Sequence, residues 1–205
     1  MRRYLYPSSV FINCPFDRQY QNIFDALIFA VFDCGFVPHC AMEIDDGSQI
    51  RIEKIFNIIE GCKFSIHDIS RTELDPGTRL PRFNMPLELG MFLGAKRFGG
   101  KKQKEKTCMV MDRERYRFQQ YISDIAGQDI KAHNDEPEKV VRLVRDWLNS
   151  TTKRRTIPGG PVIWRRYESY TEDLPGLCDA VPMSVDDMTF NDKATFASEW
   201  LKENY

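Results

Sequence analysis

Ser8-Ser-Val-Phe-Ile-Asn-Cys-Pro-Phe16 is a short apolar run that ends in a turn, a pattern typical of a buried strand. The residues that follow at helical spacing predict a helix, which Gly35 ends: Ile23, Phe24, Leu27, Ile28 and Val31. A buried strand followed directly by such a helix is the start of a βαβ unit. This stretch therefore predicts an α/β fold with a parallel sheet.

The same alternation continues along the chain. We expect further strands at residues 36–42, 63–70, 107–112 and 129–133, and Pro38 suggests that the first of these lies at a sheet edge. Apolar spacing predicts helices around residues 52–59, 85–95 and 137–148, with a short helix at 116–125. Five strands in about 150 residues predict a flavodoxin-like, doubly wound five-stranded parallel sheet of order 2-1-3-4-5.

The character of the chain changes at Thr151. We take residues 1–150 as one α/β domain and residues 151–205 as a C-terminal helical extension. Ile157-Pro-Gly-Gly-Pro-Val162 breaks regular structure, a short helix is expected around 163–170, and another around 196–201. The extension is too short to hold its own core. We expect it to pack on the main domain or across a dimer interface, and we expect a homo-oligomer.

The overall charge excludes some partners. The 205 residues carry a net charge of −1 with a pI of about 6.3, so we expect no binding to nucleic acid and none to a membrane surface. No apolar run reaches the roughly 18 residues that span a bilayer. The first residues have no leader-like pattern, which predicts a cytoplasmic protein.

Cysteine and histidine show no metal-binding pattern. The six cysteines include no C-x-x-C pair, and the three histidines have no ligand spacing. We therefore expect reduced thiols, no metal and no cofactor.

Glu88 is the one charged residue in Met85-Pro-Leu-Glu-Leu-Gly-Met-Phe-Leu-Gly-Ala95. A helix that is apolar all round is normally buried, and an unpaired carboxylate there is costly. Pro86 suits a first helical turn, so we expect Glu88 in that turn, near the positive end of the helix dipole. Glu88 then either stabilises its own helix end or presents a carboxylate at a ligand site.

The ends of two strands carry polar residues. Ligands of open α/β sheets bind beyond the carboxyl ends of the strands, here between the first and third. The first strand leads to Phe16 and Asp17, and the third to Asp68, Ser70 and Arg71. The helix with Glu88 follows directly, so Asp68 and Glu88 should converge in this crevice. Candidate substrate-binding residues are Asn84, Phe16, Asp17, Ser70, Arg71 and Arg82, and Arg79 lies on the same loop.

These residues also have structural interpretations. Asp68 can cap a turn, Asp17 can cap the first helix, and Ser70 can serve as a turn hydroxyl. The loop arginines can pair with Glu73 and Asp75. The motifs G-x-G-x-x-G, G-x-x-x-x-G-K-[ST] and G-x-S-x-G are absent, which argues against an ordinary Rossmann dehydrogenase, a P-loop enzyme and an α/β-hydrolase.

Three motifs carry a family resemblance. Phe11-Ile-Asn-Cys-Pro-Phe16, Asp68-Ile-Ser70 and Asn84-Met-Pro-Leu-Glu88-Leu-Gly-Met-Phe-Leu-Gly94 resemble the nucleoside 2-deoxyribosyltransferase-like superfamily. The chain looks closest to its bacterial TIR-like branch, where N-x-x-x-E-L-G is a typical helix start. The resemblance covers roughly residues 8–150. Enzymes of this superfamily cleave N-glycosidic bonds of nucleosides, nucleotides or NAD.

The resemblance implies roles for individual residues. Glu88 becomes the catalytic carboxylate, Asp68 the substrate-binding or acid/base partner, and Asn84 lines the site. The deoxyribosyltransferases have an aspartate six residues before the glutamate, where this chain has Arg82. This departure puts nucleoside exchange in doubt and suits an anionic, phosphorylated substrate.

The expected function is N-glycosidic bond hydrolysis or transfer on a nucleotide or dinucleotide, with NAD as a candidate substrate. Glu88 would stabilise or trap the oxocarbenium at C1′, by analogy with retaining glycosidases. The alternative is a non-catalytic nucleotide-binding sensor or signalling module of the same fold.

Overall fold

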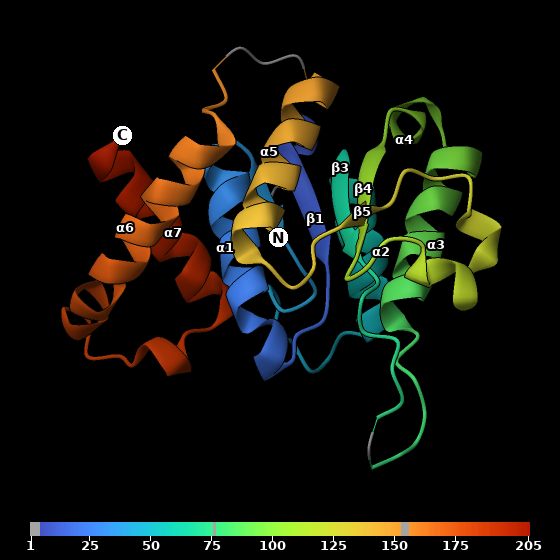
Figure 1. The fold of residues 1–205 in the computed structure, drawn as a ribbon, viewed down its shortest axis with the longest axis horizontal. Coiled ribbons are helices and arrows are strands. Elements are labelled where there is room, and N and C mark those ends of the chain that lie inside the picture. The colour runs from blue at the N-terminus through green and yellow to red at the C-terminus, as the bar shows by residue number, and fades with distance from the viewer. Residues whose placement is uncertain (1–4, 76, 153–155) are drawn as a thin grey trace.

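The protein is built around a five-stranded, all-parallel sheet of order β2-β1-β3-β4-β5. The computed structural model describes residues 5–75, 77–152 and 156–205. The strands are β1 (Ser9–Asn13), β2 (Val37–His39), β3 (Phe64–Asp68), β4 (Thr107–Asp112) and β5 (Lys131–Ala132). The flavodoxin-like fold and its strand order are thus confirmed (Figure 1).

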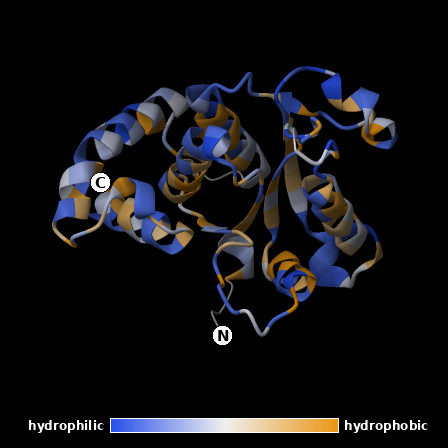
Figure 2. Ribbon diagram, turned by 90° about the horizontal axis from the view of Figure 1, so that it is seen from below, coloured by the Kyte–Doolittle hydropathy of each residue, from blue (hydrophilic) through white to orange (hydrophobic). Residues whose placement is uncertain are grey.

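Helices cover both faces of the sheet. On one face lie α1 (Gln21–Asp33) and α5 (Pro137–Thr152), and on the other α2 (Arg51–Gly61) and α3 (Asn84–Phe98), with the short α4 (Lys101–Lys104) beside α3 (Figure 1). Hydrophobic residues gather on the strands and on the helix sides that face them (Figure 2). Among the described helices, none combines the length and the hydropathy that crossing a membrane would require.

The residues that predicted strands, a sheet edge and a helix end occupy those positions in the structure. Both β1 and β3 are buried along their whole length, because each is covered by helices on its two faces. The strand with Pro38 is an edge strand, where a missing backbone donor does least harm. Gly35 has a φ of 79° and ends α1. All six cysteines are free thiols, and all but Cys108 are buried.

Several elements differ from the sequence prediction, including the second strand, which is only Val37–His39, and the last helix, which extends over Phe190–Asn204. The expected helix at 116–125 is two 3-10 turns, Arg117–Gln120 and Ser123–Ile125, because Tyr116 adopts a left-handed φ of 62° and the chain does not wind continuously. The fifth strand is shorter, at Lys131–Ala132. In the extension, α6 (Gly160–Asp179) is a long helix that continues past Tyr170, since Leu174 and Leu177 extend its apolar face against the core.

The C-terminal extension forms a further layer of helices outside α1 and α5. Its helices α6 and α7 (Phe190–Asn204) pack on α1 and α5 (Figure 1). The ring of Phe29, on α1, contacts Tyr167 and Tyr170 on α6 and Trp200 on α7, with centroids 5.2–5.9 Å apart. The extension therefore shares one hydrophobic core with the α/β domain.

Trp200 provides a test of this shared core. It is 5% exposed and its indole Nε1 donates to Asp173 Oδ2 at 2.9 Å. Trp200→Ala should lower the free energy of unfolding by about 3–5 kcal/mol, while the whole chain still unfolds in one transition. Denaturant unfolding followed by circular dichroism measures this. Phe98→Ala is the control, because Phe98 is 85% exposed and should change stability by less than about 0.5 kcal/mol. Separate unfolding of the extension would contradict the shared core.

Candidate functional site

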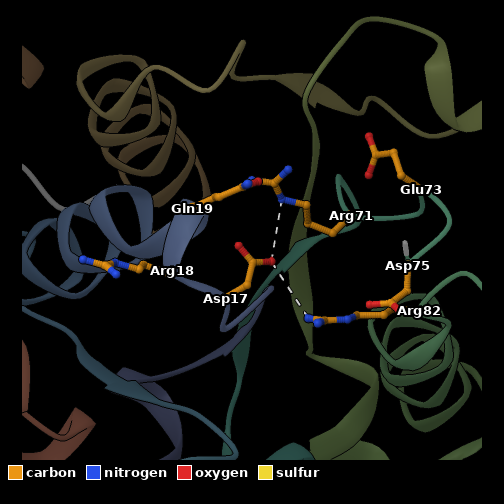
Figure 3. A pocket seen from close by; sticks show the side chains of 7 residues that line it. All are labelled: Asp17, Arg18, Gln19, Arg71, Glu73, Asp75 and Arg82. Carbon is orange, nitrogen blue, oxygen red and sulfur yellow. Dashed lines mark ion pairs between the residues drawn. The ribbon is translucent and has the colours of Figure 1, made fainter. Parts of the chain in front are cut away.

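A cavity of about 370 Å³ opens at the carboxyl ends of β1 and β3. The residues that line it come from the segments that follow β1 and β3. They are Asp17, Arg18, Gln19, Arg71, Glu73, Asp75 and Arg82 (Figure 3). This is the switch point of the sheet, where ligands of doubly wound folds bind. Three of the expected substrate-binding residues, Asp17, Arg71 and Arg82, therefore lie together.

Two arginines face one carboxylate in this cavity. Arg71 Nε lies 3.7 Å and Arg82 Nη1 lies 3.9 Å from Asp17 Oδ2, reaching it from two sides (Figure 3). These distances are too long for hydrogen bonds, and both pairs are partly exposed, so the pairing is weak. Asp17 also accepts a bond from the Tyr20 backbone at 3.1 Å, which caps the 3-10 turn leading into α1. The guanidinium groups remain available to an anionic ligand.

Glu88 is a buried residue whose carboxylate has no partner among the described residues. It is 6% exposed, and among the residues that the structure describes it makes no hydrogen bond and no ion pair. Burial raises its pKa to about 7, although the charge of Arg51 acts in the opposite direction. Because α3 begins at Asn84, Glu88 lies in the second helical turn rather than the expected first. The helix-end interpretation is weakened, since the dipole effect falls off beyond the first turn.

Asp68 is a fully buried carboxylate with several partners. Tyr20 Oη donates to Oδ2 at 2.7 Å, the Ser70 backbone donates to Oδ1 at 2.8 Å, and His133 Nε2 lies 3.0 Å from Oδ2. Burial raises the pKa of Asp68, but His133, Ser70 and Tyr20 together outweigh it, so the net pKa lies below its usual range. Asp68 is therefore ionised at neutral pH. Sequence reasoning missed His133, which directly follows β5 at the same edge.

The thiol of Cys14 is affected by three of the candidate carboxylates. Burial raises the pKa of its thiol well above the usual value, and the charges of Cys40, Asp68, Glu88 and Asp17 raise it further. The charges of Asp17, Asp68 and Glu88 therefore all act on the residue that follows β1. Neither Asp68 nor Glu88 lines the open cavity, so their convergence at this crevice stays a prediction.

The remaining candidates lie around this crevice. Asn84 is exposed at the start of α3, and Phe16 is half-buried with its ring edge-on to Phe24 at 5.3 Å. Ser70 is 2% exposed, and its hydroxyl has no hydrogen-bond partner among the described residues. None of these three lines the cavity.

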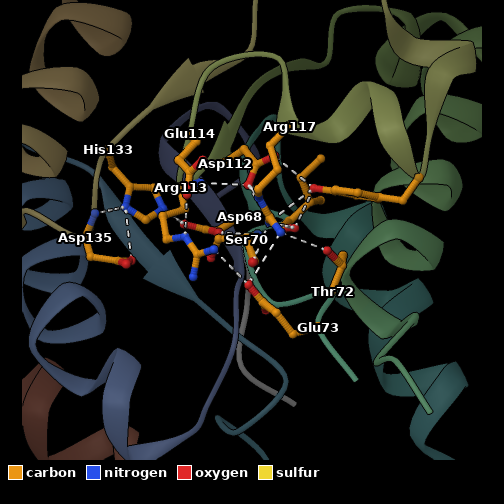
Figure 4. A network of polar contacts seen from close by, with 12 residues as sticks. Asp68, Ser70, Thr72, Glu73, Asp112, Arg113, Glu114, Arg117, His133 and Asp135 are labelled. Carbon is orange, nitrogen blue, oxygen red and sulfur yellow. Dashed lines mark hydrogen bonds and ion pairs between the residues drawn. The ribbon is translucent and has the colours of Figure 1, made fainter. Parts of the chain in front are cut away.

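A second polar network was missed from the sequence. Arg117 donates to Asp112 Oδ1 through Nε at 2.9 Å and through Nη2 at 2.6 Å, and Tyr121 Oη donates to Asp112 Oδ2 at 2.9 Å (Figure 4). Arg117 also donates to the Ser70 carbonyl and, at 3.2 Å, to the Thr72 hydroxyl. The network thereby anchors the start of the loop that carries Arg71. Asp112 ends β4 at the same edge as Asp68, and that position is the signal that could have found it.

The chain matches no protein family model, no curated protein and no solved structure.

Proposed function

We propose that the protein cleaves an N-glycosidic bond of a nucleotide or dinucleotide, by hydrolysis or transfer, with Glu88 as the catalytic carboxylate. The observation that carries this proposal is the burial of Glu88, which finds no partner within residues 5–75, 77–152 and 156–205. An unpaired buried carboxylate destabilises a protein, and groups perturbed by burial cluster at functional sites. The resemblance of residues 84–94 to the helix start of N-glycosidic bond enzymes supports the same role.

The environment of Glu88 suits an oxocarbenium transition state. Breaking the bond between C1′ and a base nitrogen develops positive charge on the sugar. A carboxylate in apolar surroundings stabilises this charge more strongly than one in water, or traps it covalently. Only the ionised form can act in this way, so the rate of base release should rise with pH up to about 7.

The state of Asp68 favours one kind of leaving group. A neutral base needs a general acid when it leaves, and Asp68 was the expected donor. Its lowered pKa and complete burial argue against that role, because an ionised aspartate has no proton to give. A cationic nicotinamide leaves without protonation. NAD and related pyridinium nucleotides are therefore the substrates that this site supports best.

The arginines at the mouth support an anionic substrate. Arg82→Gln should raise the KM for a nucleotide by about tenfold while KM for the matching nucleoside stays nearly unchanged, because a charge-assisted bond to phosphate is lost. Steady-state kinetics with both substrates measures the ratio. Arg79→Gln is the matched control, since Arg79 lies on the same loop but does not line the cavity. Equal effects of the two substitutions would contradict a phosphate subsite at Arg82.

A nucleotide sensor without catalysis is the second candidate. It is favoured by the absence of Glu88 from the cavity lining, since a ligand could occupy the open cavity without touching that carboxylate. Incubation with NAD, nucleoside monophosphates and deoxynucleosides, followed by chromatography for free base, separates the two functions. Thermal stabilisation by a nucleotide with no base released, even at high protein concentration, would favour the sensor.

A further inference from the structure

Asn13 connects the sheet to the helix that carries Glu88. It is the last residue of β1 and is 2% exposed. Its Nδ2 donates to the carbonyl of Met85 at 2.9 Å, in the first turn of α3. Met85 precedes Glu88 by three residues, which places the two on neighbouring turns of one helix face.

The same amide is held from β3. Asn13 Nδ2 lies 2.9 Å from His67 Nδ1, and His67 Nε2 lies 2.6 Å from Ser65 Oγ. Burial lowers the pKa of His67 to about 3, so the ring is neutral. Because an amide nitrogen can only donate, Nδ1 must accept, and Nε2 carries the proton toward Ser65. A continuous hydrogen-bonded chain therefore runs from β3 through β1 to α3.

Packing also fixes the imidazole ring of His67, which is part of this series of hydrogen bonds. The ring of His67 contacts Phe11 with centroids 5.8 Å apart and Phe92 with centroids 5.2 Å apart. Phe92 lies on α3, one turn beyond Glu88. The position of the acceptor Nδ1 is thus set by both the sheet and the helix.

Glu88 has no such support of its own. Its carboxylate makes no hydrogen bond among the described residues, so its place depends on the backbone of α3. Arg51, at the start of α2, is the group whose charge lowers the pKa of Glu88, and Glu88 itself raises the pKa of Cys14 after β1. Movement of the first turn of α3 would therefore also shift the next turn, where Glu88 lies, and admit water to the carboxylate.

We propose that Asn13 is a positioning residue, whose amide holds the first turn of α3 against β1 and β3 and thereby sets where the Glu88 carboxylate stands. The consequence for catalysis rests on the proposed function. The consequence for the protonation of Glu88 does not.

Replacement of Asn13 by leucine removes both donated bonds with little change in size. The pKa of Glu88 should then fall from about 7 by at least one unit toward its ordinary value of 4.5, because water reaches the loosened turn. In the proposed reaction, kcat should fall by about tenfold or more while KM changes by less than about threefold, since the substrate is still bound but the carboxylate is misplaced.

The direct test is a pH titration of protein labelled with ¹³C at the glutamate carboxyl groups, followed by NMR. Glu88→Gln assigns the signal, and Asn204→Leu is the control, because Asn204 Nδ2 also donates to a helix carbonyl, that of Trp200, at 2.8 Å. If Asn13→Leu does not fold, Asn13→Ser, which keeps one donor, should shift the pKa by a smaller amount. An unchanged Glu88 pKa in the variant that folds would overturn the proposal. Absence of base release by the wild type would refute the proposed function alone, because the titration needs no turnover.

Discussion

Glu88→Gln is expected to lower the rate of base release by at least about 10²-fold. Glutamine keeps the shape of the side chain but cannot carry the negative charge that opposes the oxocarbenium. The loss should appear in kcat and in kcat/KM alike, because the interaction is made only in the transition state. Glu53→Gln is the matched control, since Glu53 is exposed on the first turn of α2, and its activity should equal that of the wild type.

The same substitution should make the protein more stable above pH 7. The pKa of Glu88 is about 7 in the folded protein and near 4.5 when unfolded, so the wild type loses stability as the pH rises from 4.5 to 7. The loss is on the order of 3 kcal/mol and is complete above pH 7. Glu88→Gln avoids it, so the two proteins should be equally stable at pH 4.5 and differ at pH 8. Equal stability at both pH values would show that Glu88 is solvated.

Arg117→Met is expected to lower the free energy of unfolding by about 3–5 kcal/mol. It leaves Asp112, which is fully buried, without its positive partner, and breaking a buried pair on one side costs more than the pair contributes. Denaturant unfolding at pH 7 measures the change. The loop that carries Arg71 should also loosen, because Arg117 holds the Ser70 carbonyl.

Two further variants test the cause of that loss. Arg113→Met removes a neighbouring arginine whose Nη2 lies 3.1 Å from Glu73 Oε1 at the surface. This substitution should lower the free energy of unfolding by at most about 1 kcal/mol. In the double variant, Asp112→Asn added to Arg117→Met should recover part of the stability, because no unpaired charge remains buried. A double variant that is less stable than Arg117→Met would contradict this explanation.

The fold was predictable because its signals are local. Buried runs such as residues 107–112, which the structure reproduces as β4, alternate with helical spacing, and Pro38 marked the edge strand. The 3-10 turns after β4 were not predictable in the same way. They depend on the left-handed backbone of Tyr116, which no pattern of apolar residues encodes.

The candidate site was predictable where residues directly follow a strand. The positions of Asp17 and Arg71 after β1 and β3 placed both at the cavity. Hydrogen-bond and ion-pair partners that come from distant segments of the chain could not be predicted from the sequence. Asp68 depends on Tyr20, Ser70 and His133, whose contacts form only through folding and keep its pKa below the usual range despite burial. The lack of a hydrogen-bond or ion-pair partner for Glu88 in the described part of the chain likewise follows from its neighbours in space rather than from its neighbours in sequence.

The central claim is that Glu88 acts on an N-glycosidic bond, and single-turnover base release tests it most directly. Wild type and Glu88→Gln would each be held in excess over NAD at pH 7.5, with free nicotinamide quantified by chromatography over time. The wild type should release nicotinamide in a single exponential phase, and Glu88→Gln should be slower by at least about 10²-fold. Equal release by the two proteins, or none from the wild type with NAD or with the nucleotide that stabilises it most, would contradict the account.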